Sequence, residues 1–93
     1  MTLRITSFDW DEHNLWHIEN HPIHPFQRDA VEELFLSGKF KVRKTRMDRY
    51  IALGQNLDGQ YLVVVFQNKG GGKIRPISAR TMEHWEKRLY GRK

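Results

Sequence analysis

The hydrophobic pattern of the chain centres on one stretch, residues 60–80. Its first arm, residues 60–67 (QYLVVVFQ), is the most apolar run and is rich in β-branched residues, which favours a strand. Both faces of this arm are apolar, so we expect it in the middle of a sheet with cover on both sides. Residues 68–72 (NKGGG) predict a hairpin turn, because glycine adopts positive φ without strain. Residues 73–80 are the expected return strand.

Three further strands are expected before this hairpin. Residues 39–45 alternate apolar and basic side chains, and the exposed lysines are typical of an edge strand. Residues 49–54 (RYIALG) form the next predicted strand, and a turn at residues 56–59 leads from it into the central one. Residues 3–10 alternate loosely and predict a first strand. Pro76 cannot donate a ladder hydrogen bond, so it predicts a bulge or an unpaired side in the return strand.

Two helices are expected between the first strand and the edge strand. The first spans residues 11–20, after a capping-box pattern in residues 9–12, with Leu15 and Ile18 inward. Pro22 ends it, since the residue before a proline avoids helical dihedrals. The second begins at Pro25 and ends at residues 37–38 (SG). Its apolar face is built from Phe26, Ala30, Val31, Leu34 and Phe35.

A third helix is expected over residues 79–90, and it completes the predicted fold. Its apolar face holds Met82, Trp85, Leu89 and Tyr90. Trp85, and Tyr61 of the central strand, could stack on unpaired bases, but packing in the core is the favoured expectation for both. The order is then β-α-α-β-β-β-β-α, a single α+β domain over residues 1–93 with an antiparallel sheet, two N-terminal helices and one C-terminal helix.

Charge separates the two halves of the chain. The net charge is +5, but residues 1–38 hold two basic and seven acidic residues, whereas residues 39–93 hold fourteen basic and four acidic residues. Such asymmetry favours a polyanionic partner for the second half. The chain has no cysteine, which excludes disulfides and thiolate metal sites. No apolar stretch spans a bilayer, so we expect a cytoplasmic protein without membrane contact.

The histidines leave two possibilities open. His13, His17 and His21 recur every four residues and line one stripe of the first predicted helix. Two histidines at this spacing can share a zinc ion, but no third ligand is fixed by the spacing. A proton-transfer role near neutral pH is the more plausible use.

Six segments of the chain resemble the BrnT family, the toxins of BrnT/BrnA type II toxin–antitoxin systems. Their order and spacing match from about residue 8 to residue 90. The segments at residues 49–54 and 77–80 are specific when they are taken together. The six are residues 8–11 (FDWD), 17–23 (HIENHPI), 49–54 (RYIALG), 62–66 (LVVVF), 74–80 (IRPISAR) and 86–90 (EKRLY).

This resemblance implies a ribonuclease toxin related in fold to the RelE toxins. It also implies a BrnA-like ribbon-helix-helix antitoxin as a partner, with DNA contacted only indirectly through that antitoxin. The expected substrate is RNA. The expected enzyme is an endoribonuclease of the mRNA interferase type, which inhibits translation and needs no cofactor.

The chemistry of metal-independent RNA cleavage selects the candidate residues. Attack by the 2′-hydroxyl needs a base, an acid for the leaving oxygen, and cations that hold the charge on phosphorus. Arg49, Arg75 and Arg80 are the candidate phosphate clamps, because the guanidinium fork matches phosphate oxygens. His21, or His17, is the candidate proton-transfer residue, and Glu86 is a candidate base or orienting group.

Further basic and aromatic residues are candidates for holding the RNA chain, because cations bind phosphates and aromatic rings stack on unpaired bases. They are Lys41, Arg43, Tyr50, Arg88 and Tyr90. A non-catalytic RNA-binding or antitoxin-binding module of the same fold is the alternative function. The sequence leaves open whether the basic face meets RNA or mainly the antitoxin.

Overall fold

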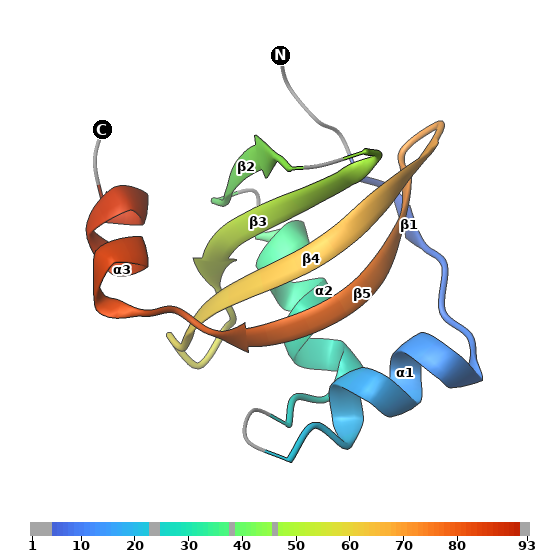
Figure 1. Cartoon of the computed structure of the whole chain (residues 1–93), viewed down its shortest axis with the longest axis horizontal. Coiled ribbons are helices and arrows are strands. Elements are labelled where there is room, and N and C mark those ends of the chain that lie inside the picture. Colours follow the sequence, from blue (N-terminus) through green and yellow to red (C-terminus); the bar gives the residue numbers. More distant parts are fainter. Residues whose placement is uncertain (1–4, 23–24, 38, 46, 92–93) are drawn as a thin grey trace.

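Five strands and three helices make up the structure, a computed structural model that describes residues 5–22, 25–37, 39–45 and 47–91 (Figure 1). The predicted α+β order is confirmed. No helix of these described ranges is long and apolar enough to cross a membrane. In chain order the elements are β1 (Ser7–Phe8), α1 (Glu12–Glu19), α2 (Arg28–Leu36), β2 (Lys41–Lys44), β3 (Arg49–Gln55), β4 (Tyr61–Gly70), β5 (Lys73–Thr81) and α3 (His84–Gly91).

The strands form one mixed sheet in the order β1-β5-β4-β3-β2. The predicted central position of β4 and edge position of β2 are confirmed. Strands β2 to β5 pair antiparallel, as expected, but β1 runs parallel to β5, with Ser7 opposite Lys73 and Phe8 opposite Ile74. The expectation of a purely antiparallel sheet is therefore wrong at this edge, because the first and last strands are joined through the rest of the chain rather than by a hairpin.

The central hairpin of β4 and β5 is longer than the sequence predicted. Strand β4 continues to Gly70, and the three consecutive glycines 70–72 all have positive φ (88°, 61° and 86°). The register shifts where Val65 faces Ser78 and Phe66 faces Pro76, which leaves Ile77 as an extra residue. The predicted bulge at Pro76 is confirmed, and it bends β5 around the sheet.

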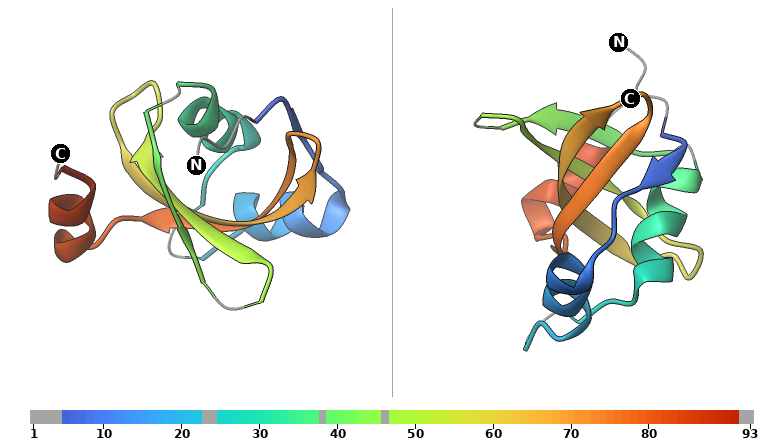
Figure 2. Two further views of the ribbon diagram at one scale, coloured as in Figure 1. Left: turned by 90° about the horizontal axis from the view of Figure 1, so that it is seen from above. Right: turned by 90° about the vertical axis from the view of Figure 1, so that its right-hand side faces the viewer.

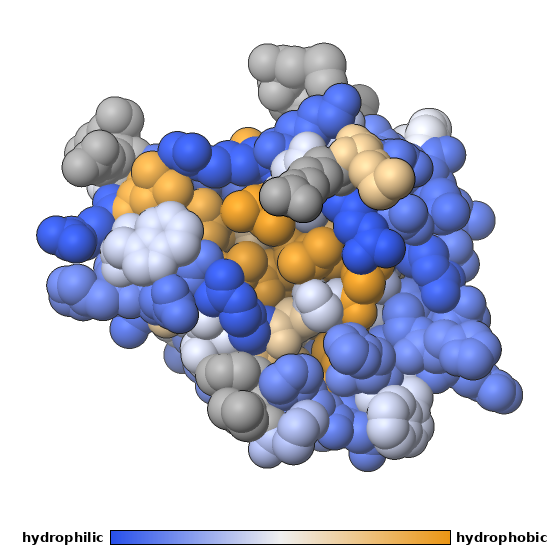
Figure 3. Space-filling view, in the orientation of Figure 1, coloured by the Kyte–Doolittle hydropathy of each residue, from blue (hydrophilic) through white to orange (hydrophobic). Residues whose placement is uncertain are grey.

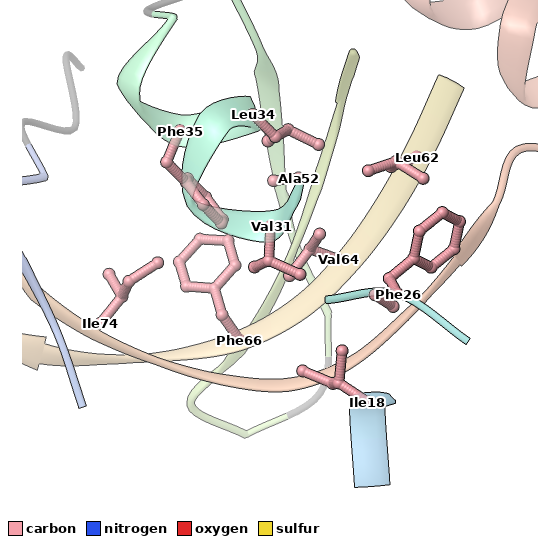
Figure 4. Close-up of a cluster of buried hydrophobic side chains, with 11 residues drawn as sticks. Ile18, Phe26, Val31, Leu34, Phe35, Ala52, Leu62, Val64, Phe66 and Ile74 are labelled. Carbon is pink, nitrogen blue, oxygen red and sulfur yellow. The ribbon is translucent and has the colours of Figure 1, made fainter. Parts of the chain in front are cut away.

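One face of the sheet is covered by α2, while α1 packs along the β5 side (Figure 2). Phe66 lies at the centre of this core, with its ring 5.3 Å from that of Phe35 and 5.6 Å from that of Tyr50. Figure 4 shows how these side chains from α1, α2 and the strands meet. The buried members are Ile18, Phe26, Val31, Leu34, Phe35, Ala52, Leu62, Val64, Phe66, Ile74 and Ala79.

The N-terminal boundaries of α1 and α2 lie later than predicted. In α1 the cap is Asp11, whose carboxylate accepts from the backbone of residues 13 and 14, and the Asn14 side chain completes the box by accepting from the Asp11 N–H. The expected box in residues 9–12 is thus two residues too early. Helix α2 begins at Arg28 rather than at Pro25, and its N-cap Gln27 makes no side-chain cap.

The C-terminal segment departs most from the prediction. Strand β5 continues to Thr81, so α3 begins at His84 rather than near residue 79. Met82 is buried against β3 and β4, as expected. Trp85, however, is 53% exposed and Tyr61 is 38% exposed, so the expectation that both pack in the core is wrong. The buried residue of α3 is a carboxylate, Glu86, which is 1% exposed.

Candidate functional site

The sheet face opposite α2 carries cations in register, and we call it the open face. Residues directly opposed on neighbouring strands turn their side chains to the same side, so the strand pairing arranges this face in rows. The first row is Arg49, Gln67 and Arg75; the second is Arg43, Ile51, Val65 and Ser78; the third is Lys41, Leu53, Val63 and Arg80.

Each row has a cation at one or both of its ends, and the middle of the second and third rows is apolar, whereas Gln67 lies in the middle of the first. Strand β2 supplies two cations on one margin and β5 supplies two arginines on the other. Strands β3 and β4 supply an apolar floor in the second and third rows, and Arg49 and Gln67 in the first. Figure 3 shows this face as a hollow with an apolar centre and a hydrophilic rim. Helix α3 closes one end of it, where Leu89 and Tyr90 pack against the floor.

Arg80 and Glu86 form a two-pronged ion pair between the end of β5 and α3. The distances are 2.6 Å from Nη1 to Oε1 and 2.8 Å from Nη2 to Oε2. The Arg80 hydrogen bonds, with a further one from the Glu83 backbone N–H, hold the pKa of Glu86 below its ordinary value. Glu86 in turn raises the pKa of Arg80 and keeps the guanidinium charged.

This geometry favours one of the two roles predicted for Glu86, and that role stays a prediction. Both of its oxygens already accept hydrogen bonds and its side chain is 1% exposed, so a carboxylate in this position is suited to orienting Arg80 rather than to taking a proton. Arg80 is 43% exposed. Of its five N–H groups, two bond Glu86 and one bonds the Thr81 carbonyl, and the other two have no partner within the described ranges.

Arg75 is held by acids at the opposite margin. Its Nη2 lies 2.8 Å from Asp11 Oδ2, and its Nη1 lies 3.5 Å from Asp9 Oδ2. Asp11 also caps α1, and the backbone N–H of Asn14, together with Arg75, lowers the pKa of this carboxyl. Arg75 therefore ties β5 to the start of α1, and its charge is compensated by two carboxylates.

Three other predicted cations carry no such compensation. Arg43, Arg49 and Arg88 are exposed, and none of them pairs with a carboxylate among the residues that the structure describes. Arg49 and Arg75 lie two strands apart in the same row, about 10 Å between Cα atoms. The row of Arg80 lies roughly 13 Å further along the strands. The three predicted clamps thus share one face, with Arg80 at its far end.

Lys41, Tyr90 and Tyr50 were also predicted to contact RNA. Lys41 and Tyr90 link β2 to α3, because Lys41 Nζ donates to the Leu89 carbonyl at 3.3 Å and the Tyr90 hydroxyl donates to the Lys39 carbonyl at 2.9 Å. Tyr50 lies on the α2 side of the sheet, stacked on Phe66, and is not brought to the open face.

His21 is not a residue of the sheet and so belongs to none of the rows. It follows α1, and its ring is 6.1 Å from that of His17. The strand register does not bring it into the rows of arginines, and its predicted role in proton transfer stays a prediction. Within the described part of the chain, no three His, Asp or Glu side chains are grouped so as to hold a metal ion.

Sequence reasoning missed two polar members of the rows, Gln67 and Ser78, and the exposure of Trp85. The rows depend on the bulge at residue 77, which shifts β5 by one position against β4. Period-two alternation alone assigns the wrong face to one side of such a bulge. One signal was available: Arg49 and Tyr50 are consecutive in a strand, so only one of them can face the arginines.

The fold and this face define a class: a small basic α+β protein whose open sheet face presents arginines suited to a phosphate-bearing ligand. The chain belongs to the BrnT family, since the family model described as "Ribonuclease toxin, BrnT, of type II toxin-antitoxin system" matches residues 10–86. No curated protein matches the chain.

The crystal structure of the Brucella abortus ribonuclease toxin BrnT is similar to this structure, with a TM-score of 0.65. The two chains are 26% identical, and the match covers 89% of this chain and all (100%) of that one. The predicted membership in the BrnT family and the predicted α+β fold are thereby confirmed. The relation to RelE toxins stays a prediction.

Proposed function

We propose that this chain is a metal-independent endoribonuclease toxin that binds RNA on the open face and is neutralised by a ribbon-helix-helix antitoxin. Its place of action is the cytoplasm, where it cuts mRNA and thereby inhibits translation. The observation that carries the proposal is the exposed guanidinium of Arg80, which the buried Glu86 orients toward the same face as Arg49.

The proposed reaction uses the substrate's own nucleophile. The 2′-oxygen attacks the adjacent phosphorus while its proton passes to a base, and the bond to the 5′-oxygen breaks as that oxygen gains a proton. Negative charge accumulates on the phosphoryl oxygens in between, where donors fixed in advance are most effective. The free N–H groups of Arg80 supply these donors, and the unpaired fork of Arg49, roughly 13 Å further along the strands, holds a neighbouring phosphate of the same RNA chain.

Fixing Arg80 before the substrate binds is the contribution of Glu86. The two hydrogen bonds of 2.6 and 2.8 Å hold the guanidinium plane, so little side-chain freedom is lost when phosphate arrives. For the proton transfers, His21 stays the predicted residue. The cleavage chemistry itself requires no metal ion, because charge stabilisation is left to the guanidinium groups.

A second function, a non-catalytic RNA-binding or antitoxin-binding module, is favoured by one observation. Arg75 and Arg80 are both neutralised by carboxylates in the free protein, which reduces their attraction for a polyanion. Such a module binds RNA in a salt-dependent way and leaves it intact.

The test incubates purified protein with single-stranded RNA in the presence of EDTA. We expect cleavage, growth arrest on expression, and relief of that arrest when the antitoxin is co-expressed. Arg80→Ala, checked for folding by circular dichroism, abolishes cleavage, and Arg80→Lys serves as a second variant that keeps the charge without the fork. Intact RNA together with salt-dependent binding supports the module. No cleavage, no binding and no growth arrest contradict both functions.

A further inference from the structure

A hollow of about 410 Å³ lies between β2 and α3, at the end of the open face that holds Arg80. It is lined by Arg43, Trp85, Arg88 and Leu89. This volume falls within the range of roughly 300–1,000 Å³ that is typical of small-ligand sites. The mechanism above uses none of these four residues.

The aromatic wall of the hollow is exposed and fixed in orientation. Trp85 is 53% exposed, which is unusual for a side chain that normally gains most from burial. Its indole Nε1 donates to Glu83 Oε2 at 2.7 Å. The one hydrogen-bond donor of the indole is thereby occupied, and what the ring still offers a ligand is its π-face.

Two guanidinium groups flank this ring. Arg88 follows Trp85 by three residues, so the two side chains are neighbours on the surface of α3. Arg43 faces them from β2 across the hollow. Neither arginine is paired with a carboxylate in the part of the chain that the structure describes. A flat apolar surface between two available cations matches the alternation of base and phosphate in a single-stranded nucleic acid.

We propose that this hollow is a base-stacking subsite: one unpaired RNA base lies on Trp85 while Arg43 and Arg88 bind the neighbouring phosphates. The proposal rests on the proposed function in that its ligand is the RNA substrate. Trp85 directly precedes Glu86 in α3, so the base is held within one helical turn of the ion pair that orients Arg80. The subsite positions the strand for cleavage.

The proposed subsite also predicts which bases and which form of RNA bind most tightly. Stacking on a ring face accepts every base, so the choice among bases follows their stacking area, and purines bind more tightly than pyrimidines. Bases paired within a duplex do not offer their faces, so double-stranded RNA is excluded. The occupied Nε1 leaves no hydrogen bond from Trp85 to read a base edge.

The test measures binding of a fluorescein-labelled single-stranded RNA whose 2′-hydroxyls are methylated to prevent cleavage. By fluorescence anisotropy we expect Trp85→Ala to raise Kd about tenfold, and Trp85→Phe to raise it by less than about threefold. The matched control is Trp16→Ala, which removes another exposed tryptophan (66%) on α1, outside the lining of the hollow, and leaves Kd unchanged.

A second arm removes the base instead of the ring. RNAs with one abasic nucleotide at successive positions weaken binding to the unaltered protein at one position, and Trp85→Ala becomes insensitive to that change. Equal affinity of Trp85→Ala and Trp16→Ala for RNA overturns the subsite. So does an effect of Trp85→Ala on antitoxin binding alone, which assigns the hollow to a protein partner.

These outcomes separate the subsite from the proposed ribonuclease activity. If Arg80→Ala abolishes cleavage while Trp85→Ala binds and cleaves as the unaltered protein does, the subsite is wrong and the ribonuclease proposal stands. If the protein binds RNA through Trp85 but cuts none, the subsite stands and cleavage is wrong.

Discussion

The two faces of the sheet are built from the same strands but differ in composition and burial. Toward α2, alternate residues of β4 (Leu62, Val64 and Phe66) are fully buried in one continuous core. Toward the open face, the intervening residues of β4 lie in rows that each contain one or two cations of β2, β3 or β5. Because side chains alternate along a strand, the same strands supply both the core beside α2 and the cation-bearing open face.

The difference is clearest between neighbouring residues. Arg43 faces the hollow, whereas Lys44, the next residue of β2, belongs to the other face. Ala79 lies in the core, whereas Arg80, the next residue of β5, is turned toward α3 and Glu86. Substitutions of such neighbours therefore separate stability from binding, and each prediction below compares one face with the other or tests the ion pair that joins β5 to α3.

The largest effect is expected in the core. Phe66→Ala removes a ring that is 0% exposed and packs against two other rings, so we expect a loss of about 3–5 kcal/mol in the free energy of unfolding. Val65→Ala, one residue earlier and half-buried on the open face, costs about 1 kcal/mol. Urea denaturation measures both. Equal losses would show that the two faces contribute equally to stability.

An intermediate effect is expected at the ion pair between β5 and α3. Glu86→Gln removes the charge that holds Arg80, and we expect a loss of about 1–2 kcal/mol at pH 7, discounted for the exposure of Arg80. Glu19→Gln, on the exposed surface of α1, is the matched control and stays near the original stability.

The same pair gives a pH dependence with a defined sign. Folding lowers the pKa of Glu86 from its ordinary value of 4.5, so its stabilisation is present above that value and is lost as pH falls below it. Urea midpoints between pH 7 and pH 3 therefore decline less for Glu86→Gln than for the unaltered protein. Parallel declines for the two proteins would argue against a stabilising charge at this position.

The smallest effect is expected for single cations of β2. Arg43→Ala reduces the slope of log K against log salt for RNA binding by about 0.7–1, because one phosphate contact is lost. Lys44→Ala removes the adjacent charge from the other face and leaves the slope unchanged. Titrations at several salt concentrations compare the two variants. A similar reduction for both would mean that overall charge, and not the open face, governs binding.

The strands of this protein were predictable, whereas the site was predictable only in part. The β-branched run of β4 and the glycine turn carry local signals strong enough to place the central hairpin. The start of α3 was not predictable locally, because pairing with β4 extends β5 through residues that also suit a helix. That extension also determines which residues of α3 are buried, and so Trp85 was wrongly expected in the core.

Of the candidate site, the arginines could be predicted from the sequence, whereas their carboxylate partners could not. Arg49, Arg75 and Arg80 were selected by type and motif, and the strand register gathers them on one face. Their carboxylate partners were not predictable, because Arg75 meets Asp9 and Asp11 only through the β1–β5 pairing. Parallel pairing between the two ends of a chain has no local signal in the sequence.

The central claim is that RNA is cut on the open face, and Arg49 tests it most directly because it is exposed and has no carboxylate partner in the described ranges. The measurement is the cleavage rate of one labelled single-stranded RNA by Arg49→Ala and by Arg28→Ala, which removes an exposed arginine at the start of α2. We predict a fall of about 10²-fold for Arg49→Ala, because the RNA chain is no longer held in position, and an unchanged rate for Arg28→Ala. Equal rates for the two variants would contradict the account.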